Sequence, residues 1–264
     1  MKTGFIGGGN MSRAIIGGLI SSGFARPDEI TVSDIDQKIL DGLERDFGVK
    51  TTRDNRTVAL SEGIILLAVK PQFYPEVIAE VKSCAGDDKI FITIAPGWTI
   101  ERLYTAFGCK LKIVRAMPNT PALVGEGMSA FCPGETLTPD ETQLTEDFFG
   151  SFGRAVQLPE RLMDSFVGLC GSSPAFVFVI IEAMADAAVR EGFPRTMAYT
   201  LAAQAVLGSA KMVLESGQHP AELKDNVCSP AGTTIEGVAA LEEKGVRHAI
   251  MTAVQRACAK SRDM

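Results

Sequence analysis

Residues Thr3–Ser12, TGFIGGGNMS, decide the fold of this chain. The stretch Thr3–Gly7 predicts a buried strand, and Met11–Ser22 predicts a helix directly after it. Between them the glycines stand in a G-x-G-x-x-S spacing, which permits a tight turn and lets phosphates approach the N–H groups at the helix N-terminus. Such a turn between the first strand and the first helix is typical of a dinucleotide-binding fold. The alternative is an ordinary glycine-rich turn without a ligand.

Strands and helices alternate from this turn up to residue 159. Runs of β-branched and other apolar residues that are unbroken, rather than alternating with polar ones, indicate strands buried on both faces of a parallel sheet. Strands are predicted at Glu29–Ser33, Gly63–Val69, Lys89–Ile94, Leu111–Met117, Met128–Cys132 and Ala155–Leu158, with helices at Gln37–Phe47 and near Glu76–Ser83. The alternation predicts an α/β fold with an N-terminal Rossmann-like, dinucleotide-binding domain over residues 1–159.

From Glu160 to the end the pattern changes, and we predict no strand there. Stretches rich in Ala, Met, Leu and Glu predict helices over Ala175–Glu191, Arg195–Ser216 and Thr234–Arg262. Residues 160–264 are therefore expected to form an all-helical domain. Phe176–Ile181 is apolar at every position, so its helix needs cover on several sides. We expect a second copy of the chain to provide it, which makes this the dimerisation domain; the alternative is packing on the α/β domain alone.

Composition excludes several classes of protein. The 264 residues hold 26 Lys and Arg against 32 Asp and Glu, a net charge of −6, which argues against a nucleic-acid partner. The six cysteines and two histidines lack the short spacings of a metal site, so no metal is expected. The apolar runs Ile64–Val69 and Ala175–Ile181 are shorter than the roughly twenty residues that span a bilayer. Without a secretion signal at Met1, we expect a reduced, cytoplasmic protein that binds no membrane.

Residues at strand ends carry the candidate chemistry, because open α/β sheets bind ligands beyond the carboxyl ends of their strands. An acidic residue at the position of Asp34 usually accepts hydrogen bonds from the adenosine ribose and disfavours a 2′-phosphate. The nearest following cation is Lys38. Alternatively, Asp34 only caps the next turn. The segments Ala68–Gln72 and Ile94–Gly97 close two further strands and could flank a nicotinamide.

Two segments beyond these strands hold polar groups in a small-residue context. Arg115–Pro121 predicts a rigid loop that either faces a cleft or is a purely structural turn. Asp225–Thr234, DNVCSPAGTT, opens the last helical stretch with small residues and two hydroxyls. The N–H groups at such a helix N-terminus can hold a carboxylate. Alternatively, Thr233 or Thr234 simply caps the helix.

Five stretches in order, GFIGGGNM, ILLAVKPQ, RAMPNTPALV, GSSPAFVF and LKDNVCSPAGTTIE, together resemble pyrroline-5-carboxylate reductase over essentially the whole chain. The resemblance implies transfer of a hydride from NADPH, or from NADH as the rival cofactor, to the C=N carbon of 1-pyrroline-5-carboxylate. The product is L-proline, and the reaction is the last step of proline biosynthesis. The resemblance also implies a homodimer through the helical domain, with dimers assembling into a decamer.

The resemblance assigns roles to individual residues. Those implied to bind the cofactor are Gly7, Gly8, Gly9, Asn10, Met11, Ser33, Asp34, Asn55, Ala68, Val69, Lys70, Pro71, Ala95, Pro96, Gly97 and Asn226. Those implied to bind the substrate are Glu160, Ser229, Gly232, Thr233 and Thr234. Thr234 is also the implied catalytic residue, hydrogen-bonded to the imine nitrogen. The chain departs from the family pattern at Ala231, where most members have a second glycine.

Two other functions remain as alternatives. A β-hydroxyacid-type dehydrogenase has a similar two-domain plan but relies on a Lys near the start of its helical domain, and Met163–Leu169 contains none. A non-catalytic NADPH-binding sensor would share the cofactor half but would not need the Ser229–Thr234 turn. Feedback by proline and the range of cyclic imines accepted stay open.

Overall fold

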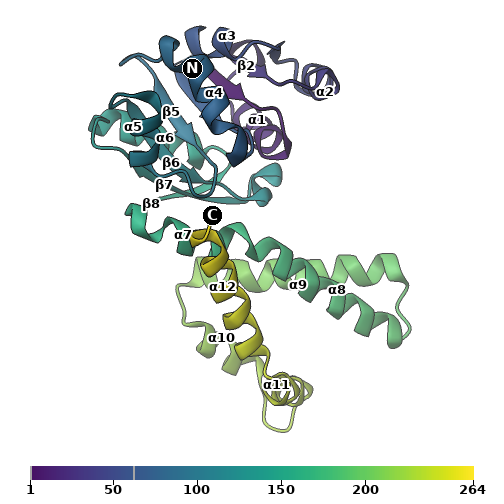
Figure 1. Cartoon of the computed structure of the whole chain (residues 1–264). Helices are drawn as coiled ribbons and strands as arrows, with labels where there is room; N and C mark the ends of the chain where they lie inside the picture. Colours follow the sequence, from purple (N-terminus) through teal and green to yellow (C-terminus); the bar gives the residue numbers. More distant parts are fainter. Residues whose placement is uncertain (1, 62) are drawn as a thin grey trace. The chain divides into compact units, whose positions relative to one another are not determined.

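The computed structural model describes residues 2–61 and 63–264, which form two compact units (Figure 1). The first unit runs to Ser172 and includes Ala257–Met264; the second is Ser173–Arg256. The division between units therefore comes later in the sequence than the boundary predicted after residue 159. That boundary follows the last strand, β8 (Gly153–Gln157), and stays a prediction.

A single sheet organises the first unit. In the described residues its eight strands follow the order β3-β2-β1-β4-β5-β6-β7-β8, and each pair is parallel except β6–β7. The connection 118–126 between β6 and β7 is too short for a parallel crossover, which needs a dozen or more residues. The remaining bounds are β1 (Thr3–Ile6), β2 (Ile30–Ser33), β3 (Lys50–Thr52), β4 (Ile64–Leu67), β5 (Ile90–Thr93), β6 (Lys112–Met117) and β7 (Gly127–Pro133). All predicted strands are confirmed, and β3 is an addition.

Helices cover both faces of this sheet (Figure 1). One face is packed by α1 (Asn10–Ser21), α2 (Gln37–Phe47) and α6 (Pro139–Gly150). The other is packed by α3 (Asn55–Ser61), α4 (Tyr74–Val81) and α5 (Ile100–Phe107). Neighbouring strand residues serve opposite cores: Phe5 and Leu66 face α1, whereas Ile6 and Leu67 face α4. This double burial is the physical reason for the unbroken apolar runs.

Short turns complete the first unit. The 3₁₀ turns are Pro27–Glu29, Pro71–Phe73, Lys82–Cys84, Thr120–Val124 and Glu160–Leu162. After the last of these come α7 (Met163–Phe166) and a π-helical turn, Val167–Gly171. The end of the chain docks on α7, because Ser261 Oγ donates to Asp164 Oδ1 at 3.0 Å and Arg262 donates to Ser165 Oγ at 3.2 Å. These contacts explain why Ala257–Met264 belongs to the first unit.

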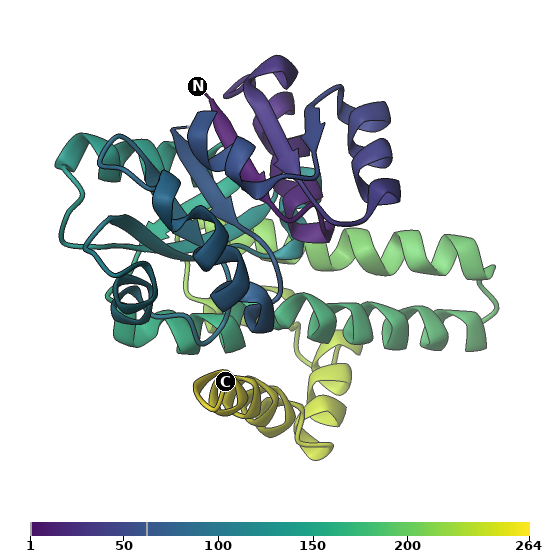
Figure 2. The ribbon, with the colours of Figure 1, turned by 45° about the horizontal axis from the view of Figure 1, so that its top comes forward.

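Two long helices dominate the second unit, α8 (Ser173–Arg190) and α9 (Arg195–Ser216), which run side by side (Figure 2). They meet through small side chains, among them the buried Ala185, Ala198 and Ala202. The other helices are α10 (Pro220–Val227), α11 (Thr233–Glu243) and the part of α12 (Val246–Arg262) up to Arg256. The prediction of one helix over Thr234–Arg262 was wrong, because Gly245, with φ +69°, ends one helix and begins another. No strand occurs in the described stretch 160–264, as predicted.

The surfaces of α8 and α9 are apolar. Exposed fractions reach 62% at Phe178, 65% at Val179 and 61% at Leu214. The helical stretches Glu160–Arg190 and Arg195–Ser216, with mean hydropathy 1.8 and 1.2, are long and apolar enough to cross a membrane. These stretches are longer than the predicted apolar run Ala175–Ile181, because several alanines after Ile181 keep the mean hydropathy high. Surfaces of this kind require a partner, either lipid or protein.

Candidate active site

The glycine turn is fixed by contacts to three neighbouring segments. Gly7 donates its N–H to Ser33 O at 2.8 Å, and Ser12 Oγ donates to Gly7 O at 2.6 Å. Gly7 has φ +104°, and a Cβ added there would lie 2.8 Å from the carbonyl carbon of Ala68. A glycine is therefore required where the turn passes the end of β4.

The N-terminus of α1 is open toward a ligand. Gly9 is the N-cap residue, and no described side chain caps the helix. A Cβ added at Gly9 would meet nothing within 4 Å, so packing within the protein does not require a glycine there. The first N–H groups of a helix have no intrahelical acceptor, and the helix dipole makes this end positive. The geometry thus leaves space and free donors for an anion such as a pyrophosphate.

A cavity of about 380 Å³ lies beside the turn. Of the residues predicted to bind the cofactor, it is lined by Gly7, Gly9, Ser33, Asp34, Asn55, Ala68, Val69 and Lys70. The structure thus brings together the ends of β1, β2 and β4, as the parallel topology requires. Its other walls, which were not predicted from the sequence, are Ile35, Ile39, Phe73, Glu76, Val77 and Glu80. Most of these lie on loops and helices beyond the strand ends, where no local motif marks them.

Acidic and amide groups form the polar end of the cavity. Asp34 accepts from Gly8 N–H at 2.7 Å through Oδ2 and from Asp36 N–H at 2.9 Å through Oδ1. It therefore caps the following turn and also lines the cavity, and a hydrogen bond from a ribose to Asp34 stays a prediction. Asn55 accepts from Ser33 Oγ at 2.8 Å and donates to Glu80 at 2.7 Å. Many acceptors at this end suit the hydroxyl donors of a ribose.

Apolar side chains flank this polar end. Ile35 is 82% exposed and Phe73 is 45% exposed, although both are large and apolar. With Val77 they offer a surface on which the flat face of an adenine can pack. Exposure of such side chains beside a cavity is typical of a ligand site.

The loop after β5 is tied to the loop after β4. Trp98 donates its indole N–H to Pro71 O at 3.1 Å and stacks on Tyr74 with ring centroids 4.7 Å apart. Burial raises the pKa of Tyr74 far above its usual value, which keeps its hydroxyl a donor to Leu67 O. Ala95, Pro96 and Gly97 lie in this braced loop but do not line the described cavity, nor do Gly8, Asn10, Met11 and Pro71.

Glu160 is held by structural partners. Its Oε1 accepts from the N–H of Ile100 at 2.9 Å and from the guanidinium of Arg115 at 3.5 Å. Arg115 is only 2% exposed and also pairs with Asp164 at 3.1 Å. These contacts anchor the start of α5, and a role for Glu160 toward substrate stays a prediction.

The side chain of Asn119, in the loop after β6, makes two hydrogen bonds within the protein. Its Oδ1 accepts from Met128 N–H at 2.9 Å, and its Nδ2 donates to Cys170 O at 3.0 Å. Asn119 is buried, so its amide joins β7 to the π-helical turn instead of facing a cleft. Arg115–Pro121 was predicted either to face a cleft or to be a purely structural turn, and the contacts of Asn119 favour the structural turn at that residue.

The predicted substrate turn belongs to the second unit. Gly232, not a threonine, is the N-cap of α11, and no described side chain caps that helix. Thr233 and Thr234 are the first two helical residues, so neither hydroxyl is used for capping. Gly232 N–H donates to Ser229 O at 3.0 Å, which closes the turn. Ala231 has φ +56°, a left-handed conformation that favours glycine.

Asn226, the last predicted cofactor residue, lies exposed in α10 of the second unit and does not line the cavity. No group of three or more His, Cys, Asp or Glu side chains in residues 2–61 and 63–264 is arranged to hold a metal ion.

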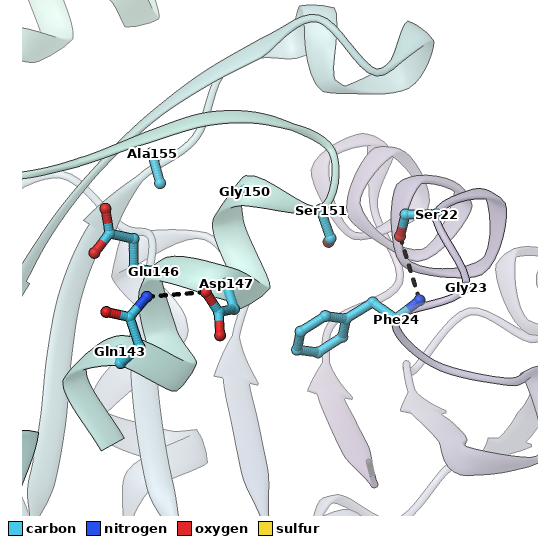
Figure 3. A pocket seen from close by; sticks show the side chains of 9 residues that line it. All are labelled: Ser22, Gly23, Phe24, Gln143, Glu146, Asp147, Gly150, Ser151 and Ala155. Carbon is cyan, nitrogen blue, oxygen red and sulfur yellow. Dashed lines mark hydrogen bonds between the residues drawn. The ribbon is translucent and has the colours of Figure 1, made fainter. Parts of the chain in front are cut away.

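Another open pocket, of about 540 Å³, lies between the end of α1 and α6 (Figure 3). Its polar walls include Glu146 and Asp147, and Gln143 donates to Asp147. The 12 residues of α1 separate it from the glycine turn by about 18 Å. It contains none of the predicted site residues.

Two family models match the chain. One described as pyrroline-5-carboxylate reductase dimerisation matches residues 160–264, and one described as NADP oxidoreductase, coenzyme F420-dependent, matches residues 2–97. The first includes α8 and α9, so these apolar helices lie within the region matched as a dimerisation domain. The predicted fold class and the predicted dimerisation through the helical region are therefore confirmed.

Pyrroline-5-carboxylate reductases match this chain over nearly its whole length. The chain is 48% identical over 260 residues to pyrroline-5-carboxylate reductase of Escherichia coli (strain K12), covering 98% of this chain and 97% of that protein. It is 45% identical over 263 residues to the enzyme of that name from Methanosarcina acetivorans, covering 100% and 97%. The solved structure of Plasmodium falciparum pyrroline carboxylate reductase with NADP bound matches at TM-score 0.91 and 32% identity, covering 100% and 97%. The chain therefore belongs to the pyrroline-5-carboxylate reductase family.

Proposed function

We propose that this protein reduces 1-pyrroline-5-carboxylate to L-proline with NADPH, as the last step of proline biosynthesis in the cytoplasm. The observation that carries the proposal is the glycine turn, with its uncapped helix, open space at Gly9 and adjoining cavity, in a chain of this family. When bound, reduced nicotinamide supplies the hydride. Residues 1–159 hold the cofactor, and residues 160–264 supply the dimer face and the substrate turn.

The chain's own groups fit a dinucleotide. The N–H groups of Gly9, Asn10 and Met11 hold the pyrophosphate, and Gly8, whose own N–H donates to Asp34, lets the turn pass close to it. Ser33, Asp34 and Asn55 bind the adenosine ribose through their oxygen and amide groups. Ala68, Val69, Lys70, Pro71, Ala95, Pro96 and Gly97 line the nicotinamide side, with Asn226 as a further contact.

The substrate turn supplies donors that suit a carboxylate and an imine. Backbone N–H groups at the start of α11, with Ser229, Gly232 and Thr233, bind the carboxylate, and Glu160 is a further substrate contact. The Thr234 hydroxyl hydrogen-bonds to the ring nitrogen. A protonated imine is already electrophilic, so the protein needs to position the reacting atoms and exclude water more than to supply a strong acid.

The activity test is the loss of reduced-nicotinamide absorbance on adding 1-pyrroline-5-carboxylate, with NADPH and NADH compared at equal concentration. We expect turnover, faster with NADPH. Binding of cofactor without turnover would instead indicate a sensor. Thr234→Ala should lower kcat/KM about tenfold, the worth of one hydrogen bond to a charged group, whereas Thr234→Ser should retain most activity. Unchanged kinetics in Thr234→Ala would remove that residue from the mechanism.

We further propose that the two halves of each reaction centre come from different protomers of the dimer, with dimers assembled into a decamer. Co-expressing a variant defective at Gly9 with Thr234→Ala tests this. If chains pair at random, half of the dimers contain one copy of each variant. If centres are shared between protomers, one of the two centres in each mixed dimer has both halves intact, so about a quarter of wild-type activity should return. Activity no higher than that of the two variants alone would show that each centre is built within one chain. The mass of the assembly in solution tests the decamer.

A further inference from the structure

The ribose end of the cavity contains a charge conflict. Asp34 places a carboxylate there, and a carboxylate repels the 2′-phosphate that distinguishes NADPH from NADH. Glu80, which also lines the cavity, adds a second negative charge nearby through its bond to Asn55. A chain that uses NADPH therefore needs a cation at this end.

Arg53 is placed to be that cation. It directly follows β3, whose Thr52 pairs with Ser33 of β2, so the parallel register brings Arg53 beside the residues after Asp34. Its Nη2 donates to the carbonyl of Ile35, a wall of the cavity, at 3.2 Å. The side chain is exposed, and none of the described carboxylates forms an ion pair with it. The rest of its guanidinium is thus left for an anion.

Other cations are placed less well. Neither Arg53 nor Lys38 is among the residues that line the cavity, but Arg53 donates to the wall residue Ile35, whereas no described side-chain hydrogen bond joins Lys38, in α2, to a wall residue. Lys70 does line the cavity, but it belongs to the end of β4 on the nicotinamide side.

We propose that Arg53 binds the 2′-phosphate of NADPH and thereby offsets the repulsion from Asp34. The inference rests on the proposed function, because it assumes a nicotinamide dinucleotide in this cavity. A guanidinium can donate two parallel hydrogen bonds to a phosphate, a geometry that an ammonium cannot reproduce. The hydrogen bond to Ile35 O orients the planar group beside the cavity before the ligand arrives. Arg53 is then a specificity residue toward the cofactor, not part of the hydride-transfer step.

Calorimetric titration of the purified protein with NADP⁺ and NAD⁺ tests the proposal without turnover. Arg53→Gln should raise the Kd for NADP⁺ about tenfold and leave the Kd for NAD⁺ within about twofold, the loss expected for a charge-assisted contact. Arg53→Lys should fall between the two. Lys38→Gln is the matched control and should change the ratio of the two Kd values by less than about twofold. Adenosine 2′,5′-bisphosphate against AMP should repeat the pattern with no nicotinamide present.

A Kd for NADP⁺ unchanged in Arg53→Gln, or a loss of selectivity in Lys38→Gln alone, would overturn the inference. Equal weakening of NADP⁺ and NAD⁺ would also overturn it, since the residue would then act on the fold of the cavity. These outcomes are separate from failure of the proposed function. A wild-type protein that binds NADP⁺ through Arg53 but never reduces 1-pyrroline-5-carboxylate would support the inference and refute the reductase.

Discussion

Two positions of the glycine turn differ in what an added methyl group would meet. In Gly7→Ala, the Cβ would lie 2.8 Å from the carbonyl carbon of Ala68 and 2.9 Å from the nitrogen of Val69. Both are backbone atoms and cannot rotate away. Left-handed strain costs about 1–2 kcal/mol, and overpacking costs about 1–3 kcal/mol more. We therefore expect the free energy of unfolding to fall by about 2–5 kcal/mol in Gly7→Ala.

Gly9→Ala should behave in the opposite way. The added Cβ meets nothing within 4 Å, and φ at Gly9 is −65°, which alanine adopts without strain. The free energy of unfolding should change by less than about 1 kcal/mol, the scale of a cap substitution. The methyl group would, however, take the space through which a pyrophosphate approaches the helix N-terminus. We expect the Kd for NADP⁺ to rise at least about tenfold, a loss of about 1.4 kcal/mol.

The assay follows both quantities in both variants. Trp98 is the single tryptophan and is buried, so its fluorescence in a urea titration reports unfolding of the first unit. Calorimetric titration with NADP⁺ reports binding. If Gly9→Ala binds NADP⁺ as tightly as the wild type, or is as destabilised as Gly7→Ala, the assignment of this turn to the pyrophosphate fails.

Four further predictions concern single residues. Asn119→Ala should lower the free energy of unfolding by about 1–3 kcal/mol in urea titrations, since two partly buried backbone groups lose their partners; a change below about 0.5 kcal/mol would contradict this. Ala231→Gly should raise the melting temperature, measured by calorimetry, because it relieves left-handed strain of about 1 kcal/mol; a lower melting temperature would refute the strain. Burial, with a contribution from the carboxylate of Glu160, raises the pKa of the Cys132 thiol, so less thiolate exists at pH 8. Iodoacetamide should therefore alkylate Cys132 more slowly than the exposed Cys109, and equal rates by mass spectrometry would contradict the burial. Phe178→Glu should shift the sedimentation of the protein toward the monomer by placing a charge on the apolar face of α8; an unchanged dimer would locate the interface elsewhere.

Much of the fold follows from local sequence, because its strands carry their own signal. β1, β4 and β5 are buried on both faces, so every residue in them must be apolar or small, and the runs are visible without any contact information. α2 begins and ends at its predicted residues, since the side chain of Asp36 caps its start and Gly48 follows its end. Signals of this type need no knowledge of the tertiary fold.

Elements without such a signal were missed. β3 (Lys50–Thr52) reads KTT, lies at the edge of the sheet and has no buried residue, so no apolar run marks it. The break within Thr234–Arg262 was also missed, because Lys244–Gly245 interrupts a pattern that is otherwise helical on both sides. One glycine is tolerated within many helices, so it alone does not predict an end.

The missed strand also explains the missed cation. Distance along the chain points from Asp34 to Lys38, yet α2 contributes Ile39 and not Lys38 to the wall of the cavity. Arg53 lies further along the chain, but the pairing of Ser33 with Thr52 returns it to the same sheet edge. In our proposal, cofactor preference therefore depends on the pairing of β3 with β2 as well as on the residues that follow β2. Judged from β2 alone, Asp34 would assign the chain to NADH; under our proposal, the register of β3 adds the positive charge that lets the same site accept the 2′-phosphate of NADPH.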